Sequence, residues 1–235
     1  MKLIINDLVK KYNDKEVLTE INFEFESGKI YGLLGRNGAG KTTLFNCLNE
    51  DVEIDSGDFY LNLGDNNKKI ESDDIGYVLS TPIVPEFLTG REFLKFFIDI
   101  NKDKIDSVKT IDEYFDLVKI NKDDRDKLLK EYSHGMKNKM QMLVNIIYNP
   151  KILLLDEPLT SFDVIVAEEM KKLLKSIKKN RILIFSTHIM ELALDLCDEI
   201  VILNKGKLER INKDNLNNSE FKEKIINALK GEDNV

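Results

Sequence analysis

A glycine-rich segment near the N-terminus could hold a polyphosphate. Residues 35–42 read G-R-N-G-A-G-K-T and match the phosphate-binding pattern G-x-x-x-x-G-K-[ST]. Glycines allow consecutive backbone N–H groups to turn inward around phosphate oxygens, and a following helix adds the partial positive charge of its N-terminus. Lys41 can reach the β- and γ-phosphates of a nucleotide, and the hydroxyl group of Thr42 can ligate Mg²⁺. The segment therefore predicts a site for a nucleoside triphosphate.

A pair of carboxylates follows an apolar run later in the chain. Residues 152–155 are all apolar, and Asp156 and Glu157 come directly after them. Ligands of open α/β sheets bind at the carboxyl ends of the strands, where these acids would lie. We expect Asp156 to organise Mg²⁺, directly or through water, and Glu157 to act as a general base or to polarise the attacking water. Two adjacent acids could also form an ordinary solvated loop, but beside a phosphate site they predict nucleotide hydrolysis.

The surrounding sequence predicts strands that position these groups. An apolar strand at 29–34 leads into the glycine-rich segment, and a helix is expected to start near Lys41. Residues 21–26 alternate between apolar and polar side chains, which is typical of a half-buried strand. Further strands are expected at 59–63 and 75–79. The N-terminal third is therefore predicted to be mostly strand.

Between residues 89 and 148 the apolar period becomes helical. Thr89 with Glu92, and Thr110 with Glu113, each fit a capping box, in which a Thr and a Glu three residues later close the first turn of a helix. A third helix is expected to start at Ser133. Three successive helices without a strand between them predict a helical subdomain inserted into a sheet domain.

The remainder of the chain returns to alternating strands and helices. Strands are expected at 152–155, 181–185, 200–203 and 207–211, and helices at 163–179 and 188–196. Fully apolar strands that alternate with helices predict a parallel sheet covered on both faces. After residue 211 the sequence is polar, and a last helix is expected there, with Phe221, Ile225 and Leu229 along it.

Composition and charge exclude several classes of protein. The chain has 235 residues of which 42% are hydrophobic, so it can form a sizeable core and is not wholly disordered. Its net charge of −7 repels phosphate backbones, so no nucleic-acid partner is expected. No apolar stretch reaches the ~20 residues that span a bilayer, and the N-terminus lacks the apolar region of a signal peptide. Cys47 and Cys197 stand singly in apolar surroundings and are expected to be reduced core residues of a cytosolic protein.

In their order along the chain, these motifs resemble the ATP-binding subunits of ABC transporters. The resemblance implies an α/β fold: a P-loop NTPase core of the RecA-like type, with an N-terminal antiparallel β subdomain and an inserted α-helical subdomain. It implies one ABC ATPase domain over residues 1–235. Its parts would be a core at 1–80 and 149–211, a helical subdomain at 81–148 and a tail helix at 212–235. It also implies ATP and Mg²⁺ as cofactors.

The same resemblance assigns roles to individual residues. An aromatic residue is expected to stack on adenine, and the Walker A residues to bind the phosphates, which makes the ATP-binding set Tyr12, Gly35, Arg36, Asn37, Gly38, Ala39, Gly40, Lys41, Thr42 and Thr43. Asp156 and Glu157 match the Walker B motif and its catalytic glutamate. Asp163 ends the D-loop segment at 160–163, and His188 matches the switch histidine that contacts the γ-phosphate.

Two segments depart from the family pattern. Residues 132–137 read Y-S-H-G-M-K where the family typically has L-S-G-G-Q, a signature that faces the γ-phosphate bound by the opposite subunit. Ser133, His134, Gly135 and Met136 are expected to act there, and this variant resembles that of bacitracin-type and other antibiotic-resistance exporters. Ser80 stands where the family carries a glutamine that contacts Mg²⁺, so it is expected to reach the metal only through water.

The resemblance implies a subunit that drives transport, with export favoured by the signature variant. A permease on a separate chain is expected to dock around residues 80–90, and a second ATP-binding subunit, identical or different, to complete the dimer. The phenylalanines at 87–97 are expected in the core or in an exposed rim that receives this permease. The implied location is cytoplasmic, on the inner face of the cell membrane. The alternatives are a soluble ABC-type ATPase acting on ribosomes or DNA, and a low-turnover regulatory ABC subunit.

Overall fold

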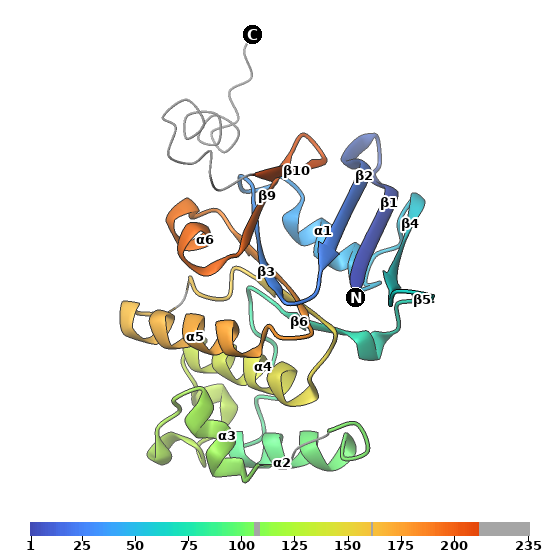
Figure 1. Ribbon diagram of the computed structural model, residues 1–235. Coiled ribbons are helices and arrows are strands. Elements are labelled where there is room, and N and C mark those ends of the chain that lie inside the picture. Colours follow the sequence, from blue (N-terminus) through green and yellow to red (C-terminus); the bar gives the residue numbers. More distant parts are fainter. Residues whose placement is uncertain (106–108, 161, 212–235) are drawn as a thin grey trace.

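The computed structural model describes residues 1–105, 109–160 and 162–211, and its centre is a six-stranded sheet (Figure 1). The strand order is β10-β9-β3-β8-β7-β6. Parallel pairing joins β9 (Glu199–Asn204), β3 (Lys29–Leu34), β8 (Ile182–Thr187), β7 (Ile152–Asp156) and β6 (Ile75–Val78), while β10 (Lys207–Ile211) is antiparallel to β9. The middle strands are nearly continuous apolar runs because both faces of the sheet are covered. The predicted α/β fold is confirmed.

Alternate residues of the central strands point into two separate cores. In β7, Leu153 and Leu155 belong to one buried cluster, whereas Ile152 and Leu154 belong to the other. The first cluster includes residues of α4 (His134–Tyr148), α5 (Val164–Ile177) and α6 (Met190–Leu196), and the second includes residues of α1 (Lys41–Leu48) and of a second sheet. The six-stranded sheet is therefore a wall shared by two cores, and it holds both groups of elements at fixed positions.

The second sheet is antiparallel and has the strand order β2-β1-β4-β5. Its members are β1 (Lys2–Tyr12), β2 (Lys15–Glu26), β4 (Ser56–Asn62) and β5 (Asn67–Lys69). It forms the N-terminal antiparallel β subdomain that the sequence predicts. The apolar spacing does not reveal β1, because its register shifts after Ile5 and Asp7 adopts a left-handed φ of 45°. This irregularity moves Leu8 out of the alternation that Leu3 and Ile5 begin.

Three helices form the predicted helical insertion, with α2 (Gly90–Ile100) and α3 (Ile111–Leu117) far from the second sheet in Figure 1 and α4 between them and α5. Both predicted capping boxes are present, and Ser133 is the N-cap of α4. Short 3₁₀ turns occur at Ser72–Asp74 (η1), Lys122–Asp124 (η2) and Leu129–Glu131 (η3).

The phenylalanines at 87–97 are not uniformly in the core. Leu94 is the fully buried residue of α2, whereas Phe96 is 57% and Phe87 is 78% exposed. Phe93 and Phe97 lie between these extremes and pack against the core. The helix buries only the side that faces α3 and α4, so its other apolar side chains remain in contact with solvent.

The remaining helices and the cysteines follow the sequence closely. Asp163 caps α5, and α6 begins two residues later than the predicted start at His188, since Ile189 is its N-cap. Both cysteines are buried, as expected, and burial raises the pKa of the Cys47 thiol to about 11. In the part of the chain that the structure describes, no helix combines the length and apolar character needed to cross a membrane. The predicted tail helix, with Phe221, Ile225 and Leu229, lies outside the described residues.

Candidate functional site

The glycine-rich segment forms the turn between β3 and α1. Gly40 is the N-cap of α1 and has a left-handed φ of 106°, and an added Cβ there would lie 2.9 Å from a methyl carbon of Val17. Gly38 also has a positive φ, of 79°. Residues other than glycine rarely adopt this backbone conformation. The turn therefore needs its glycines, and it presents the unpaired N–H groups at the start of α1, a favourable environment for an anion.

Lys41, the first residue of α1, is held against this turn. Its Nζ donates to the carbonyl oxygens of Gly35 at 2.8 Å and Arg36 at 3.2 Å. The residue is only 6% exposed, and burial lowers the pKa of its ammonium group, although Glu157 and Asp156 nearby favour the charged form. The nearest carboxylate oxygen, Oε1 of Glu157, is 3.9 Å away. The cation is thus fixed between the glycine-rich turn and the acids after β7.

Asp156, the last residue of β7, accepts hydrogen bonds at both carboxylate oxygens. The hydroxyl of Thr42 donates to Oδ2 at 2.8 Å, and the hydroxyl of Ser186 donates to Oδ1 at 2.5 Å. Hydroxyl and carboxylate oxygens are the ligands that Mg²⁺ prefers, so the donor set fits this cation. No group of three or more His, Cys, Asp or Glu that could hold a metal exists within the described ranges. A cation here would accordingly need phosphate oxygens and water to complete its coordination.

Glu157 adopts a backbone conformation that is uncommon for its type. Its φ is 47°, in the left-handed region, and its amide donates to the Ser186 hydroxyl at 3.1 Å. Its side chain is 23% exposed, and Oε1 lies 3.0 Å from Nδ1 of His188. Strained residues of this kind concentrate at functional sites, where the surrounding contacts hold them. Here the strain turns the carboxylate out of the strand and toward His188.

Ser186 is the residue that the sequence analysis misses. It is fully buried at the end of β8, where it lies opposite Asp156 in the strand register. Its hydroxyl bonds both the Asp156 carboxylate and the Glu157 amide, so one side chain orients the two acids. The available signal is a polar residue near the carboxyl end of an apolar strand: Ser186 is the last residue but one of β8, and Asp156 is the last residue of β7. Reading it requires knowing that these two strands are neighbours.

These groups surround a cleft of about 410 Å³. It is lined by Tyr12, Val17, Asn37, Gly38, Gly40, Lys41, Thr42, Thr43, Ser80, Asp156 and Glu157. Tyr12 is 44% exposed at its edge, and Nζ of Lys10 lies 5.2 Å from the centre of the Tyr12 ring. Most of the predicted nucleotide-binding residues therefore meet in one place. Gly35, Arg36 and Ala39 contribute to the turn but are not in the lining of the cleft.

Of the described residues, the signature residues 133–136 and Asp163 of the D-loop do not line this cleft. Ser133 caps α4 by accepting a hydrogen bond from the amide of Met136 at 3.2 Å, and His134 and Gly135 are the first residues of that helix. Asp163 caps α5, where Oδ1 accepts from the amides of Ile165 and Val166 at 3.0 Å each. Both capping residues are exposed, so each segment presents the start of a helix to solvent, outside the lining of the cleft.

One residue before Ser80, the chain is tied to the signature helix. The amide of Leu79 donates to Oε1 of Gln141, in α4, at 3.1 Å. Ser80 is therefore held at the side of the cleft by the helix that begins with the signature residues.

Comparison with known proteins gives concordant results. The family model described as ABC transporter matches residues 18–160, a span that includes the glycine-rich turn, the signature residues and both acids. An uncharacterised ABC transporter ATP-binding protein of Methanocaldococcus jannaschii is 36% identical over 208 residues, which cover 88% of this chain and 75% of that protein. The bacitracin transport ATP-binding protein of Bacillus licheniformis is 35% identical over 207 residues, which cover 86% of this chain and 66% of that protein.

Solved structures share the fold. A structure of an ATP-binding subunit of an ABC transporter superposes with a TM-score of 0.80 at 21% identity, covering 98% of this chain and all of that chain. A dimeric ATP-binding cassette in a post-hydrolysis state, bound to ADP and Pi, superposes with a TM-score of 0.75 at 18% identity, covering 89% of this chain and 99% of that chain. At these identities the likeness concerns the fold, and it agrees with the predicted P-loop NTPase architecture.

Proposed function

The chain belongs to the ATP-binding proteins of the ABC transporter family, and we propose that it powers a separate membrane permease by closing as an ATP-bound dimer. As a member of this family it is an ATPase. The observation that carries the dimer is the composition of the cleft: it contains the glycine-rich turn and both acids, but neither Ser133 nor Asp163. A second subunit can supply them.

Within one subunit, the residues of the cleft divide the work. The turn at 35–40 and Lys41 hold the phosphates, and Tyr12 stacks on the base. Thr42 and Asp156 would hold Mg²⁺, which would supply charge neutralisation of the phosphates, and Ser80 would reach it only through water. Glu157 takes the proton of the attacking water, and His188, 3.0 Å from the Glu157 carboxylate, reaches the γ-phosphate.

Across the dimer, the start of α4 would face the γ-phosphate of the other subunit. Ser133 and the first N–H groups of α4 offer donors to an anion, and the helix dipole favours negative charge there. Beside Asp163, Val164 is 80% and Ile165 is 74% exposed, an apolar pair that an opposing subunit would cover. The dimeric state of the similar cassette bound to ADP and Pi agrees with this arrangement.

Substitutions at Ser133 test this dimer. Asp and Asn both cap helices as well as Ser does, so Ser133→Asp and Ser133→Asn should each keep α4 intact and the melting temperature unchanged. Only Asp places a negative charge against the γ-phosphate of the opposing subunit. We expect Ser133→Asp to weaken ATP-driven association by more than about a hundredfold, and Ser133→Asn to retain most of it. Analytical ultracentrifugation with ATP measures both, and equal association of the two variants contradicts the proposed interface.

The permease would contact the apolar side chains left exposed around α2. Ile83 is 73%, Phe87 is 78%, Phe96 is 57% and Ile100 is 62% exposed. We propose that they receive an apolar cytoplasmic helix of the permease, which holds this subunit on the inner face of the membrane. We further propose export as the direction, because the signature resembles that of antibiotic-resistance exporters and one relative is a bacitracin transport protein.

Membrane association tests the proposed contact with the permease. We expect Phe87→Asp to remove the chain from the membrane fraction of cells that produce its permease, while the ATPase rate of the purified chain stays the same. Leu63→Asp, at a residue that is 46% exposed in the turn between β4 and β5, is the matched control and should leave association unchanged. If Phe87→Asp remains with the membranes, the permease does not bind this surface.

A further inference from the structure

Two segments of the helical subdomain are joined directly through their backbones. The amide of Leu129 donates to the carbonyl of Leu88 at 2.8 Å, and the amide of Arg91 donates to the carbonyl of Arg125 at 2.9 Å. Further hydrogen bonds join Lys130 to Glu86 at 3.2 Å and Gly90 to Lys127 at 3.3 Å. The first segment, 86–91, contains Phe87 and lies between Ile83 and Phe96, three of the proposed permease contacts, and the second leads into Ser133. The permease surface and the signature are thus connected by a few residues.

Tyr132 closes the connection immediately before Ser133. It is only 4% exposed, and its hydroxyl donates to the carbonyl of Asp124 at 2.9 Å. The ring lies against Gly90, the first residue of α2: a Cβ built on Gly90 would be 2.2 Å from the Tyr132 hydroxyl and 3.1 Å from its Cζ. Gly90 has no positive φ, so the requirement for glycine comes from close packing against the Tyr132 side chain and against the Arg125 carbonyl oxygen, which would lie 3.0 Å from the same Cβ. The start of α2 and Tyr132, the residue before the signature, are therefore tightly packed against each other.

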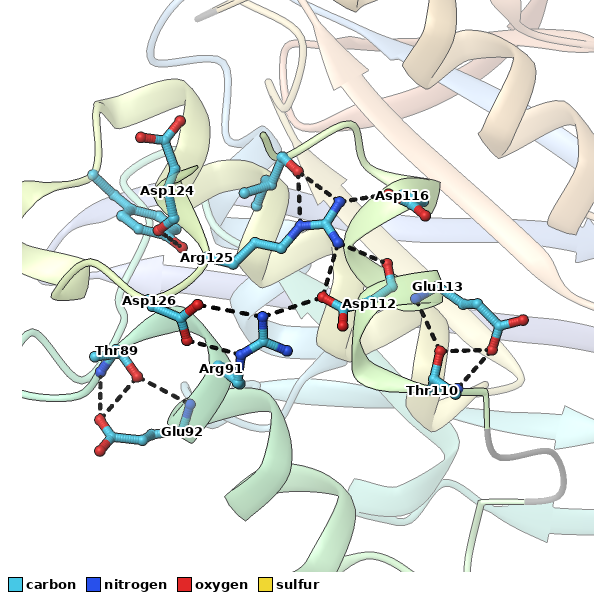
Figure 2. A network of polar contacts seen from close by, with 12 residues as sticks. Thr89, Arg91, Glu92, Thr110, Asp112, Glu113, Asp116, Asp124, Arg125 and Asp126 are labelled. Carbon is cyan, nitrogen blue, oxygen red and sulfur yellow. Dashed lines mark hydrogen bonds and ion pairs between the residues drawn. The ribbon is translucent and has the colours of Figure 1, made fainter. Parts of the chain in front are cut away.

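A network of charges fixes the loop that receives the Tyr132 hydroxyl. The guanidinium of Arg125 binds the carboxylates of Asp112 at 2.9 Å and Asp116 at 2.5 Å, and Arg91 binds Asp126 at 2.8 Å. Figure 2 shows Asp112 between the two guanidinium groups, so one carboxylate joins α2, α3 and the loop that carries Arg125. The Arg125 side chain is 4% exposed, and its guanidinium carbon lies 5.3 Å from the centre of the Phe115 ring. The loop therefore cannot shift without disturbing the ion pairs of the buried Arg125 guanidinium with the exposed carboxylates of Asp112 and Asp116.

We propose that Gly90 and Tyr132 form a positioning contact that sets the start of α4 relative to the permease surface. A displacement at 83–91 is carried through the Tyr132 ring to Ser133, and the signature closes on ATP only when this contact is intact. Neither residue touches nucleotide in its own chain, so both act through Ser133. The inference rests on the proposed dimer and adds the device that couples it to the permease surface.

The substitution Gly90→Ala tests this contact in the full chain. Its Cβ would overlap the Tyr132 hydroxyl, so the ring or the start of α2 would have to shift. In a Glu157→Gln background we expect ATP-driven association to weaken by about ten- to hundredfold, since overpacking of this kind distorts the neighbouring backbone. The affinity of the monomer for ATP should not change, because the P-loop and the acids lie in another part of the fold. Ultracentrifugation measures association, and equilibrium binding of a fluorescent ATP analogue at low protein concentration measures affinity.

Three further variants separate positioning from general destabilisation. Tyr132→Phe removes only the hydroxyl and should weaken association by about two- to tenfold. The double variant Gly90→Ala/Tyr132→Phe removes the overlap with the hydroxyl and should associate better than Gly90→Ala alone. Tyr148→Phe is the matched control: it removes a hydroxyl that bonds Asp73 at 2.5 Å from the far end of α4, and association should stay as in the background variant.

The outcomes separate a failure of the proposed dimer from a failure of the positioning contact between Gly90 and Tyr132. If the background variant itself does not associate with ATP, the proposed dimer fails and the positioning contact fails with it. If it associates and Gly90→Ala associates equally well, only the positioning contact is wrong. Independent, additive effects of the two substitutions also overturn it, because they show that Gly90 and Tyr132 do not act through each other. An equal loss of ATP affinity in the Gly90→Ala monomer assigns the residue to general stability instead.

Discussion

Replacing Glu157 with Gln lowers the rate of ATP hydrolysis by about a hundred- to ten-thousandfold, the usual range for loss of a general base. The amide keeps the size of the side chain but cannot take a proton from the attacking water. ATP binding persists, because Lys41, Thr42 and Asp156 remain in place, and Asp156 still favours the charged form of Lys41. The unhydrolysed ATP then holds the two subunits together. With ATP, a larger fraction of the variant than of the unchanged chain is therefore expected to be dimeric. Steady-state phosphate release and ultracentrifugation measure the two effects.

Glu191→Gln is the control for Glu157→Gln. It makes the same change of charge in the first turn of α6, three residues beyond His188, and both rate and association should stay the same. A Glu157→Gln variant that hydrolyses ATP at an unchanged rate removes Glu157 from the chemistry. One that is inactive but monomeric with saturating ATP keeps Glu157 in the chemistry and contradicts the dimer.

Replacing Lys41 with Met weakens ATP binding by about tenfold to more than a hundredfold, since hydrogen bonds to a charged group contribute about 1.5–3 kcal/mol. Met has a similar length and no charge, so it removes the cation without leaving a cavity. The protein itself should be as stable as before or more so. Burial lowers the pKa of Lys41, which means that folding disfavours its charged form, and Met is free of that cost. In Lys41→Met the affinity for ATP should therefore fall, while the thermal stability of the nucleotide-free chain stays the same or rises.

Calorimetric titration with ATP and Mg²⁺, together with thermal unfolding of the nucleotide-free chain, measures both quantities. Lys172→Met, on the outer part of α5, is a control in which neither should change. The affinity of the unchanged chain should also fall as the pH rises through the lowered pKa of Lys41, because only the protonated form attracts phosphate. Unaltered affinity in Lys41→Met contradicts the assignment of the glycine-rich turn as the nucleotide site.

The sequence predicts features that depend on local patterns. The Thr89 and Thr110 capping boxes, the Ser133 cap and the turn before Lys41 all involve residues within a few positions of one another, and the structure confirms each. Ser186 is different, because its importance arises from the pairing of β8 with β7, two strands separated by α5 in the sequence. Local patterns do not state which strands are neighbours.

Burial is predicted less well than secondary structure. The apolar side chains of α2 have a helical period, but the period does not show how much of the helix surface the neighbouring helices cover. Phe96 and Ile100 consequently remain exposed while Leu94 is buried. The strand β1 is also missed for a reason that local sequence does not show. Asp7 interrupts the alternation of apolar side chains, and only the pairing with β2 and β4 reveals that the chain continues as one strand.

The division of β7 between two cores has a consequence for how such proteins can diversify. Substituting Leu153 or Leu155 disturbs only the cluster shared with α4, α5 and α6. Substituting Ile152 or Leu154 disturbs only the cluster on the opposite face of the sheet. Inserting or deleting one residue would exchange all four and turn Asp156 away from Thr42, because side chains alternate along a strand. Lineages can therefore remodel the helical insertion, and with it the proposed permease surface, while the length of this strand stays fixed.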